Sequence, residues 1–389
     1  MHAGIPVAYF DGPGGTQTPQ PVVDAMSDYL LHHNANTHWR YPTSEETDAT
    51  LADARLVFGA FLGGAADEVS FGNNMTTITF HVARGLGRDW NAGDEVIVTE
   101  LDHHGNVAPW QALARERGIV LRWLPVDPAD CRLRLDLLPD LIGPRTRVLA
   151  IGAASNSVGT ITDVAAAAEW AHRAGALIFV DGVHYSPHLL PDVAALKCDL
   201  FACSAYKFHG PHVGVLWGRR ELLERIDLPR LEPALDTAPE RLETGTQNHE
   251  GIVGAAAAVR WLASLAGIAG TLREQLTLAY REIHRREAQL FQTLWDGLDA
   301  IHGVTLFGPP PTSSRTATLS FTLQNTASEQ VAIALAGAGC YVSHGDFYAT
   351  TVVRRLGLEA TGLVRLGVAC YTTADEIDRV VAAVDRIAR

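Results

Sequence analysis

The amino-acid sequence predicts an α/β protein with a mostly parallel sheet and a second, smaller domain. Three observations carry this prediction. Between residues 68 and 217, short apolar runs alternate with helical sequence, which is the pattern of a parallel sheet covered on both faces. From about residue 251 the pattern is helical over a long span, and strands and helices then mix. A chain of 389 residues that is 47% hydrophobic is long enough for two such domains.

The elements are expected in the following order. A turn-rich arm covers residues 9–23, the first helix starts near Pro21, and an amphipathic helix covers 44–62. The seven strands of the sheet are expected at 68–71, 95–99, 119–124, 147–151, 176–180, 200–203 and 213–217, with helices at 76–86, 106–117 and 163–174. The C-terminal part is expected to contain strands 316–323 and 362–368 and helices 328–338 and 374–388.

These elements group into three segments. Residues 1–20 form an N-terminal arm, 21–260 a large α/β domain and 261–389 a small α+β domain. The arm and the first helix are expected to pack on the small domain.

Composition excludes several classes of protein. A formal net charge of −13 argues against binding to nucleic acid. The five cysteines are scattered and form no CxxC motif, which indicates reduced, intracellular thiols and no zinc site. The N-terminus lacks the pattern of a signal peptide, and no apolar run reaches the roughly 18 residues of a membrane span. We therefore expect a cytoplasmic protein that does not enter membranes.

Charged side chains follow two of the predicted strands, where parallel sheets bind their ligands. Asp181 follows strand 176–180, and Lys207 follows strand 200–203. Alone, Asp181 is compatible with a metal ligand, a base or a helix cap, and Lys207 with a surface residue in a hairpin loop. Together they fit pyridoxal 5′-phosphate (PLP), which needs a lysine that forms an imine and an acid against its pyridine nitrogen.

Two further stretches fit the same cofactor. Residues 72–77 (GNNMTT) lie where the first strand passes into a helix, and backbone N–H groups at a helix N-terminus bind phosphate. The same residue types are also ordinary helix caps. Residues 101–106 (LDHHGN) follow strand 95–99, where a histidine ring would stack on a flat cofactor. A metal site is less favoured here, because adjacent histidines rarely point at one ion.

The order of these motifs resembles the class V aminotransferase family, in its cysteine desulfurase-like branch of fold type I PLP enzymes. The motifs are GNNMTT, DHHGN, SNSVGT, VDGVH, SAYKFHGP, ETGTQN and VRLGV, and the resemblance covers nearly the whole chain. The Asp181–Lys207 pair with its surroundings is specific. The other motifs are weak alone, but their shared order is strong.

The resemblance implies a role for several residues around the cofactor ring. Lys207 would bond to PLP and act as general acid and base, and Asp181 would pair with the pyridine nitrogen. His104 would stack on the ring, and Asn156 would lie near its hydroxyl. His184 stands where relatives often carry Gln, which also contacts that oxygen.

The phosphate and the substrate have their own implied residues. Asn74, Met75 and Thr76 would bind the phosphate together with Ser204 and Tyr206, where Tyr206 replaces the His of a common Ser-x-His-Lys motif. Thr246 would reach the phosphate of a neighbouring subunit, which implies a homodimer with shared active sites.

Arg365 would hold the carboxylate of an amino-acid substrate. A buried structural ion pair is the alternative for this arginine. His344 and Tyr348 would contact the substrate side chain or move protons, and they are equally compatible with plain loop residues.

The sequence differs from the family pattern at one point that concerns the reaction. Desulfurases of this branch carry a cysteine on a mobile loop, and the corresponding residues 343–349 (SHGDFYA) contain none. Cys340 lies in an apolar run and is expected to fill the core. We therefore expect a β-eliminating C–S lyase without a persulfide cysteine.

Other functions stay open at this stage. An aminotransferase, an epimerase or a kynureninase-like enzyme would begin from the same proton removal. A non-enzymatic ligand sensor on the same fold is disfavoured, because no DNA-binding domain precedes the arm. A nicotinamide-binding fold is disfavoured too, because residues 85–90 (GLGRDW) lack the third glycine and follow a helix.

Overall fold

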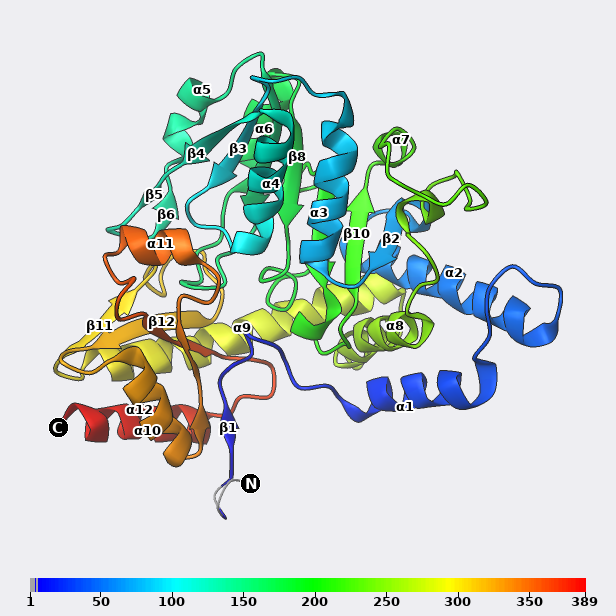
Figure 1. Ribbon diagram of the computed structural model, residues 1–389. Coiled ribbons are helices and arrows are strands. Elements are labelled where there is room, and N and C mark those ends of the chain that lie inside the picture. Colours follow the sequence, from blue (N-terminus) through cyan, green and yellow to red (C-terminus); the bar gives the residue numbers. More distant parts are fainter. Residues whose placement is uncertain (1–3, 5) are drawn as a thin grey trace.

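The computed structural model describes Gly4 and residues 6–389 and contains two main sheets (Figure 1). The helices are α1 (Gln20–Asp28), α2 (Pro42–Leu62), α3 (Met75–Leu86), α4 (Ala108–Arg117), α5 (Leu138–Leu141), α6 (Val164–Arg173), α7 (Arg220–Leu223), α8 (His249–Ser264), α9 (Leu272–Asp299), α10 (Ser328–Gly337), α11 (Thr350–Arg355) and α12 (Ala374–Ala388). The strands are β1 (Ala8–Tyr9), β2 (Val69–Gly72), β3 (Glu95–Thr99), β4 (Val120–Leu124), β5 (Val126–Asp127), β6 (Arg132–Leu133), β7 (Thr146–Gly152), β8 (Leu177–Asp181), β9 (Leu200–Ser204), β10 (Gly214–Gly218), β11 (Val304–Phe307), β12 (Thr318–Leu323), β13 (Cys340–Tyr341), β14 (Ser343–Gly345) and β15 (Leu363–Gly367).

The larger sheet has seven strands in the order β2-β10-β9-β8-β7-β3-β4. The strands from β9 to β4 are parallel to one another, and β10 is antiparallel to both of its neighbours. This confirms the predicted fold class. The carboxyl ends of β3, β7, β8 and β9 meet at one edge of the sheet, and the residues that follow these strands therefore lie close together.

Side-chain alternation along the strands builds a core on each face of this sheet. Ile97 and Leu149 pack with α2, α6, α8 and α9, whereas their neighbours Val96 and Val148 pack with α3 and α4. All four side chains are fully buried. Because successive side chains of a strand point to opposite faces, an apolar run without polar positions must be covered on both sides.

The C-terminal sheet has four antiparallel strands in the order β11-β12-β15-β14. Its core contains residues of α9, α10 and α12 and also Phe10 of the arm. Strand β1 pairs in parallel with β13, so the arm joins this part of the molecule. The expected packing of the first helix there is wrong, because α1 packs against α8. Helix α9 runs from α8 to the C-terminal sheet (Figure 1).

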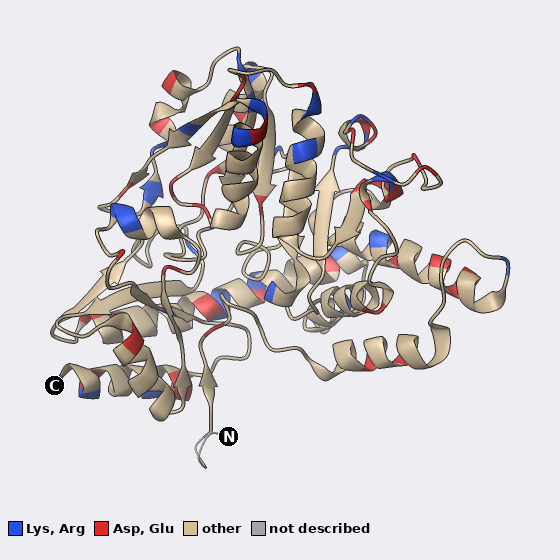
Figure 2. Cartoon of the chain, in the orientation of Figure 1, with Lys and Arg blue, Asp and Glu red and all other residues tan. Residues whose placement is uncertain are grey.

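Charge is distributed without a large area of one sign in the view of Figure 2, where acidic and basic residues are interspersed along α9 and α12. Among the residues that the structure describes, no helix is long and apolar enough to cross a bilayer. The same residues include no group of three or more His, Cys, Asp or Glu side chains that could hold a metal ion.

Candidate active site

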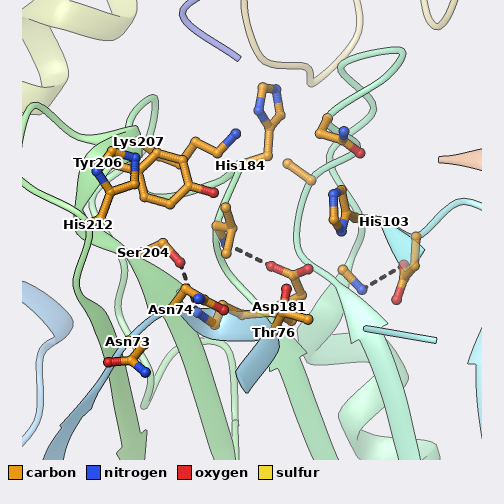
Figure 3. Close-up of a pocket in the computed structure, with 16 residues that line it drawn as sticks. Asn73, Asn74, Thr76, His103, Asp181, His184, Ser204, Tyr206, Lys207 and His212 are labelled. Atoms are coloured by element: carbon orange, nitrogen blue, oxygen red, sulfur yellow. Dashed lines mark hydrogen bonds between the residues drawn. The ribbon is translucent and has the colours of Figure 1, made fainter. Parts of the chain in front are cut away.

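A cavity of about 390 Å³ opens at the carboxyl ends of the parallel strands. It collects side chains from the ends of β3, β7, β8 and β9 and from the start of α3 (Figure 3). The residues that line it are Asn73, Asn74, Met75, Thr76, Asp102, His103, Gly152, Ala154, Asn156, Asp181, Val183, His184, Ser204, Tyr206, Lys207 and His212. Thirteen of them come from the motifs that define the family resemblance, as residues 73–76, 102–103, 156, 181, 183, 184, 204, 206 and 207.

Asp181 ends β8 with its carboxylate directed at the cavity (Figure 3). Its Oδ1 accepts a hydrogen bond from the N–H of Val183 at 2.9 Å, and no basic side chain forms an ion pair with it among the described residues. Burial raises the pKa of Asp181 to about 7, and the nearby Asp102 adds to this. A buried carboxylate without a cation needs a positively charged or N–H partner from the cavity.

Lys207 lies in the short turn Ala205–Lys207 between β9 and β10, as the sequence predicted. Burial lowers the pKa of Lys207 to about 8, and the charge of Arg365 adds to this. The Nζ atom lies 5.1 Å from the ring centre of Tyr206 and donates to the carbonyl of Gly14 at 3.0 Å. A lowered pKa increases the fraction of the lysine in the uncharged amine form that an imine-forming nucleophile needs.

The N-terminus of α3 faces the same cavity. Asn74 caps the helix, because its Oδ1 accepts from the N–H of Thr77 at 3.0 Å. The N–H of Met75 donates to Ser204 Oγ at 2.9 Å, which ties the helix start to the end of β9. Gly214 allows this approach, since a Cβ there would lie 2.6 Å from the carbonyl carbon of Asn74. The arrangement is suited to a phosphate group.

The structure corrects the prediction of which histidine lies at this site, because His103 lines the cavity and His104 does not. The carboxylate of Asp102 fixes the conformation of this loop, because it accepts hydrogen bonds from Thr99 Oγ1 at 2.7 Å and from Asn106 Nδ2 at 2.7 Å. His104 instead donates its backbone N–H to the carbonyl of Tyr348 at 2.6 Å. Burial lowers the pKa of His103 to about 4, so its ring is neutral at pH 7.

Two buried polar atoms on residues that line the cavity have no partner in the described part of the chain. They are Oδ1 of Asn156 and Nδ1 of His184. The other ring nitrogen of His184 lies 2.9 Å from Thr318 Oγ1, and Asn156 Nδ2 donates to the carbonyl of Phe347 at 2.9 Å. Unpaired buried polar groups are costly, so a polar ligand is expected to satisfy them. The hydroxyl of the PLP ring fits this need.

The remaining predicted residues lie outside the cavity lining. Arg365 is buried in β15, where it forms an ion pair with Asp11 at 3.1 Å. Tyr348 is exposed, and its ring centre is 5.5 Å from that of His103. His344 lies in β14 and Thr246 in an exposed loop, and neither reaches the cavity. The role of Thr246 concerns a second subunit and stays a prediction.

Besides His103, sequence reasoning missed three polar side chains that line the cavity. Asn73 and Asp102 stand inside motifs that were recognised, next to residues that were chosen. His212 stacks on Tyr206, with ring centres 4.8 Å apart and planes 21° apart. His212 could have been found from its place in the stretch 204–212. This stretch joins the antiparallel strands β9 and β10, so its end must return past Tyr206.

The chain resembles known proteins over nearly its whole length. The family model described as aminotransferase class-V matches residues 8–380. The chain belongs to the class V aminotransferase family. Enzymes of this family use PLP, so the predicted family, cofactor and kind of enzyme are confirmed.

The most similar class V relatives include cysteine desulfurases. The chain is 35% identical over 400 residues to a cysteine desulfurase of Synechococcus elongatus, an alignment that covers 99% of this chain and 61% of that protein. It is 34% identical to one of Klebsiella pneumoniae, covering 99% of this chain and 94% of that one. The apo structure of a cysteine desulfurase from Thermococcus onnurineus superposes with a TM-score of 0.90 at 28% identity, covering 98% of this chain and 94% of that chain.

Proposed function

We propose that this chain is a PLP-dependent C–S lyase that acts on cysteine or an S-substituted cysteine and releases the sulfur product directly. Residues that line the cavity support this proposal. Asp181 would hold the pyridine nitrogen, the start of α3 the phosphate, and Asn156 with His184 the ring hydroxyl. When bound, PLP withdraws electrons from the α-carbon of the amino acid.

Lys207 and Arg365 would act on the amino acid itself. Arg365 would bind its carboxylate, and the amine of Lys207 would take the proton from its α-carbon. The C–S bond would then break with its electron pair going to sulfur, which leaves as sulfide or as a thiol. Water would then hydrolyse the remaining three-carbon fragment, which supplies the keto oxygen of pyruvate and releases the amino group as ammonia.

The placement of the cysteines supports direct release of sulfur. Cys131, Cys198, Cys203 and Cys340 are buried, and none of the five cysteines lines the cavity. Burial raises the pKa of every one of them, to about 12 for Cys370, the only cysteine that is partly exposed. A persulfide carrier needs an exposed thiolate next to the substrate. Tyr348 is the exposed side chain beside His103 instead.

Product analysis tests this proposal. Purified protein with PLP is given cysteine and S-substituted cysteines without a keto acid, and pyruvate, ammonia and sulfide are measured. Equal amounts of pyruvate and sulfur product, without any added thiol, are expected from the wild type. The Lys207→Ala variant is expected to lose the visible absorbance band of lysine-bound PLP and about 10²–10⁴-fold in rate.

The controls separate this reaction from its alternatives. A variant with all five cysteines replaced by Ser or Ala, provided that it folds, is expected to keep its turnover. Alanine as the product of cysteine, or a rate that falls when the cysteines are replaced, would show a persulfide route and contradict direct release. Dependence on an added keto acid would show transamination.

A further inference from the structure

One turn of the N-terminal arm contacts both cationic side chains of the candidate site. Asp11 Oδ1 lies 3.1 Å from Nη2 of Arg365. The carbonyls of Pro13 and Gly14 both accept from Nζ of Lys207. Residues 11–14, called the arm turn below, do not themselves line the cavity. The arm turn thus contacts the two groups from outside the space that cofactor and substrate would fill.

The contacts of Arg365 orient its guanidinium and leave part of it free. Its side chain is 5% exposed. Of its five N–H donors, one on Nε binds Ser343 Oγ at 3.1 Å, one on Nη1 binds the carbonyl of Asn156 at 2.9 Å, and one on Nη2 binds Asp11. One donor on each Nη has no acceptor among the described residues. Two such donors match the two oxygens of a carboxylate.

The free amine of Lys207 is held from the other end of the arm turn. Its two carbonyl acceptors favour the charged ammonium form, whereas burial favours the neutral one. The charged and titratable groups that face it are Asp11 on the arm, Asp181 on β8, Arg365 on β15, and the rings of His103 and His184. In the described chain, the only hydrogen-bond acceptors of Nζ are the two carbonyls of the arm turn.

We propose that the arm turn is a positioning element, which sets where the free Lys207 amine stands relative to the Arg365 guanidinium. This inference rests on the proposed function in one respect, namely that Arg365 binds the substrate carboxylate. An amino acid held by its carboxylate presents its α-proton at a fixed distance from Arg365. The arm turn would place the amine within reach of that proton, and small errors in such a distance cost much of the rate. Asp11 is then a positioning residue.

Gly14 is the position at which this role can be tested with a matched control. A Cβ at Gly14 would lie 2.5 Å from Oδ2 of Asp11, closer than real contacts allow, so Gly14→Ala must displace Asp11 or the turn. A Cβ at the adjacent Gly15 would meet its nearest atom, a ring carbon of Tyr206, at an ordinary 3.5 Å. The pair Gly14→Ala and Gly15→Ala therefore differs in this one clash.

The chain contains only two lysines, Lys197 and Lys207, which makes the amine itself measurable. The full-length chain freed of PLP is treated with an amine-modifying reagent at a series of pH values, and modification of each lysine is followed by mass spectrometry. Lys197 is an internal reference on the surface, with its side chain 46% exposed. In the wild type, the titration midpoint of Lys207 is expected near pH 8.

Gly14→Ala is expected to lower this midpoint by about one pH unit, because the clash displaces the Asp11 carboxylate, which favours the ammonium form, or the carbonyls that accept from it. Modification of Lys207 at pH 7 then becomes about fivefold faster, while Gly15→Ala stays at the wild-type midpoint. Equal midpoints in the two variants would overturn the inference. If circular dichroism shows that Gly14→Ala is unfolded, Asp11→Ala takes its place. Its titration midpoint for Lys207 is expected to fall by the same amount, and a midpoint equal to that of Gly15→Ala would overturn the inference.

A second measurement uses the enzyme loaded with PLP. Titration with an amino acid that perturbs the absorbance of the cofactor gives a dissociation constant, which Asp11→Ala is expected to raise about tenfold by freeing Arg365 to turn away. An unchanged constant would contradict the role of Asp11. If no amino acid perturbs the wild-type spectrum, the proposed function fails, but the lysine titration still decides whether the arm turn holds Lys207.

Discussion

The buried carboxylate of Asp181 lowers the stability of the folded chain at neutral pH. It is buried, it lacks a cationic partner in the described chain, and its pKa is raised to about 7 from an ordinary value of 3.8. Between these two pH values the folded chain binds a proton that the unfolded chain has lost. Stability must therefore fall as pH rises from about 4 to about 7. Such a group makes sense where function, rather than stability, determines the residue.

Asp181→Asn separates these two effects. Without PLP, the variant is expected to be more stable than the wild type at pH 8 by about 1–4 kcal/mol, with the difference shrinking toward pH 4, since each unit of pKa shift is worth about 1.4 kcal/mol. Urea unfolding at pH 5 and pH 8 measures this. With PLP, the same variant is expected to bind the cofactor more weakly and to lose most of its activity. A stability difference that is independent of pH would refute the assignment.

Single residues show which parts of the candidate site could be predicted from the sequence and which could not. Asp181 ends one apolar strand and Lys207 follows another, and the end of an apolar run is visible in the sequence, so both were predicted. His103 was missed in favour of His104 because the loop after β3 has no periodicity. Its direction depends on the Asp102 carboxylate, which bonds to Thr99 and Gly152, and such contacts are not visible in sequence.

At the scale of elements, the start of α3 combines a helix cap with a candidate phosphate site, and the two roles can be separated at Asn74. Asn and Asp cap helices equally well, whereas a carboxylate repels a phosphate. Asn74→Asp is therefore expected to keep the thermal stability of the PLP-free chain and to weaken PLP binding by about tenfold or more. Asn74→Ala is expected to lose about 1 kcal/mol of stability.

Pyridoxal without its phosphate provides the control for this pair of variants. Its binding to Asn74→Asp is expected to match its binding to the wild type, because the added charge has no phosphate to repel. Absorbance titrations with both forms of the cofactor give the comparison. Equal loss for pyridoxal and PLP would mean that Asn74 acts on the fold of the cavity and not on the phosphate.

Elements with long apolar runs were predicted, and short ones were not. The seven strands of the large sheet and helices α2, α3, α6, α10 and α12 match their expected ranges to within a few residues. Strands β1, β11 and β14 were missed, because they have two to four residues each, too few for alternation to be visible. They form through pairing partners that are distant in sequence, such as β13 for β1.

At the scale of the whole molecule, the candidate site depends on how the two sheets are joined. The residues that line the cavity follow strands of the larger sheet, whereas Arg365 belongs to β15 of the C-terminal sheet. The two meet through the loop that carries Asn156, whose carbonyl accepts from Arg365 and whose neighbour Ser157 accepts from Ser320 on β12. The sequence places each half of the site, but contacts between distant loops set the distance between the halves.

Arg315 holds this junction together at a point away from the cavity. It is buried and has no acidic partner in the part of the chain that the structure describes, and burial lowers its pKa to about 9. Its guanidinium donates to four carbonyls, of which Val158 belongs to the loop of Asn156, and the others are Pro309, Thr316 and Thr318. The guanidinium also lies over the rings of Phe291 and Trp295, at 4.1 and 5.1 Å from their centres. A buried cation that donates to four carbonyls acts as a structural clamp, because its removal leaves all of these acceptors without their donor.

Arg315→Met tests the clamp, since Met fills similar space without any donor. We expect a loss of about 2–5 kcal/mol in the free energy of unfolding, which is the range for breaking a buried hydrogen-bond network. Because the junction also sets the place of Arg365, KM for the amino acid should rise more than kcat falls. Arg285→Met on the exposed face of α9 is the matched control, with a change of at most about 0.5 kcal/mol and no change in KM. A stability loss without a rise in KM would show that the junction supports the fold but not the alignment of the site.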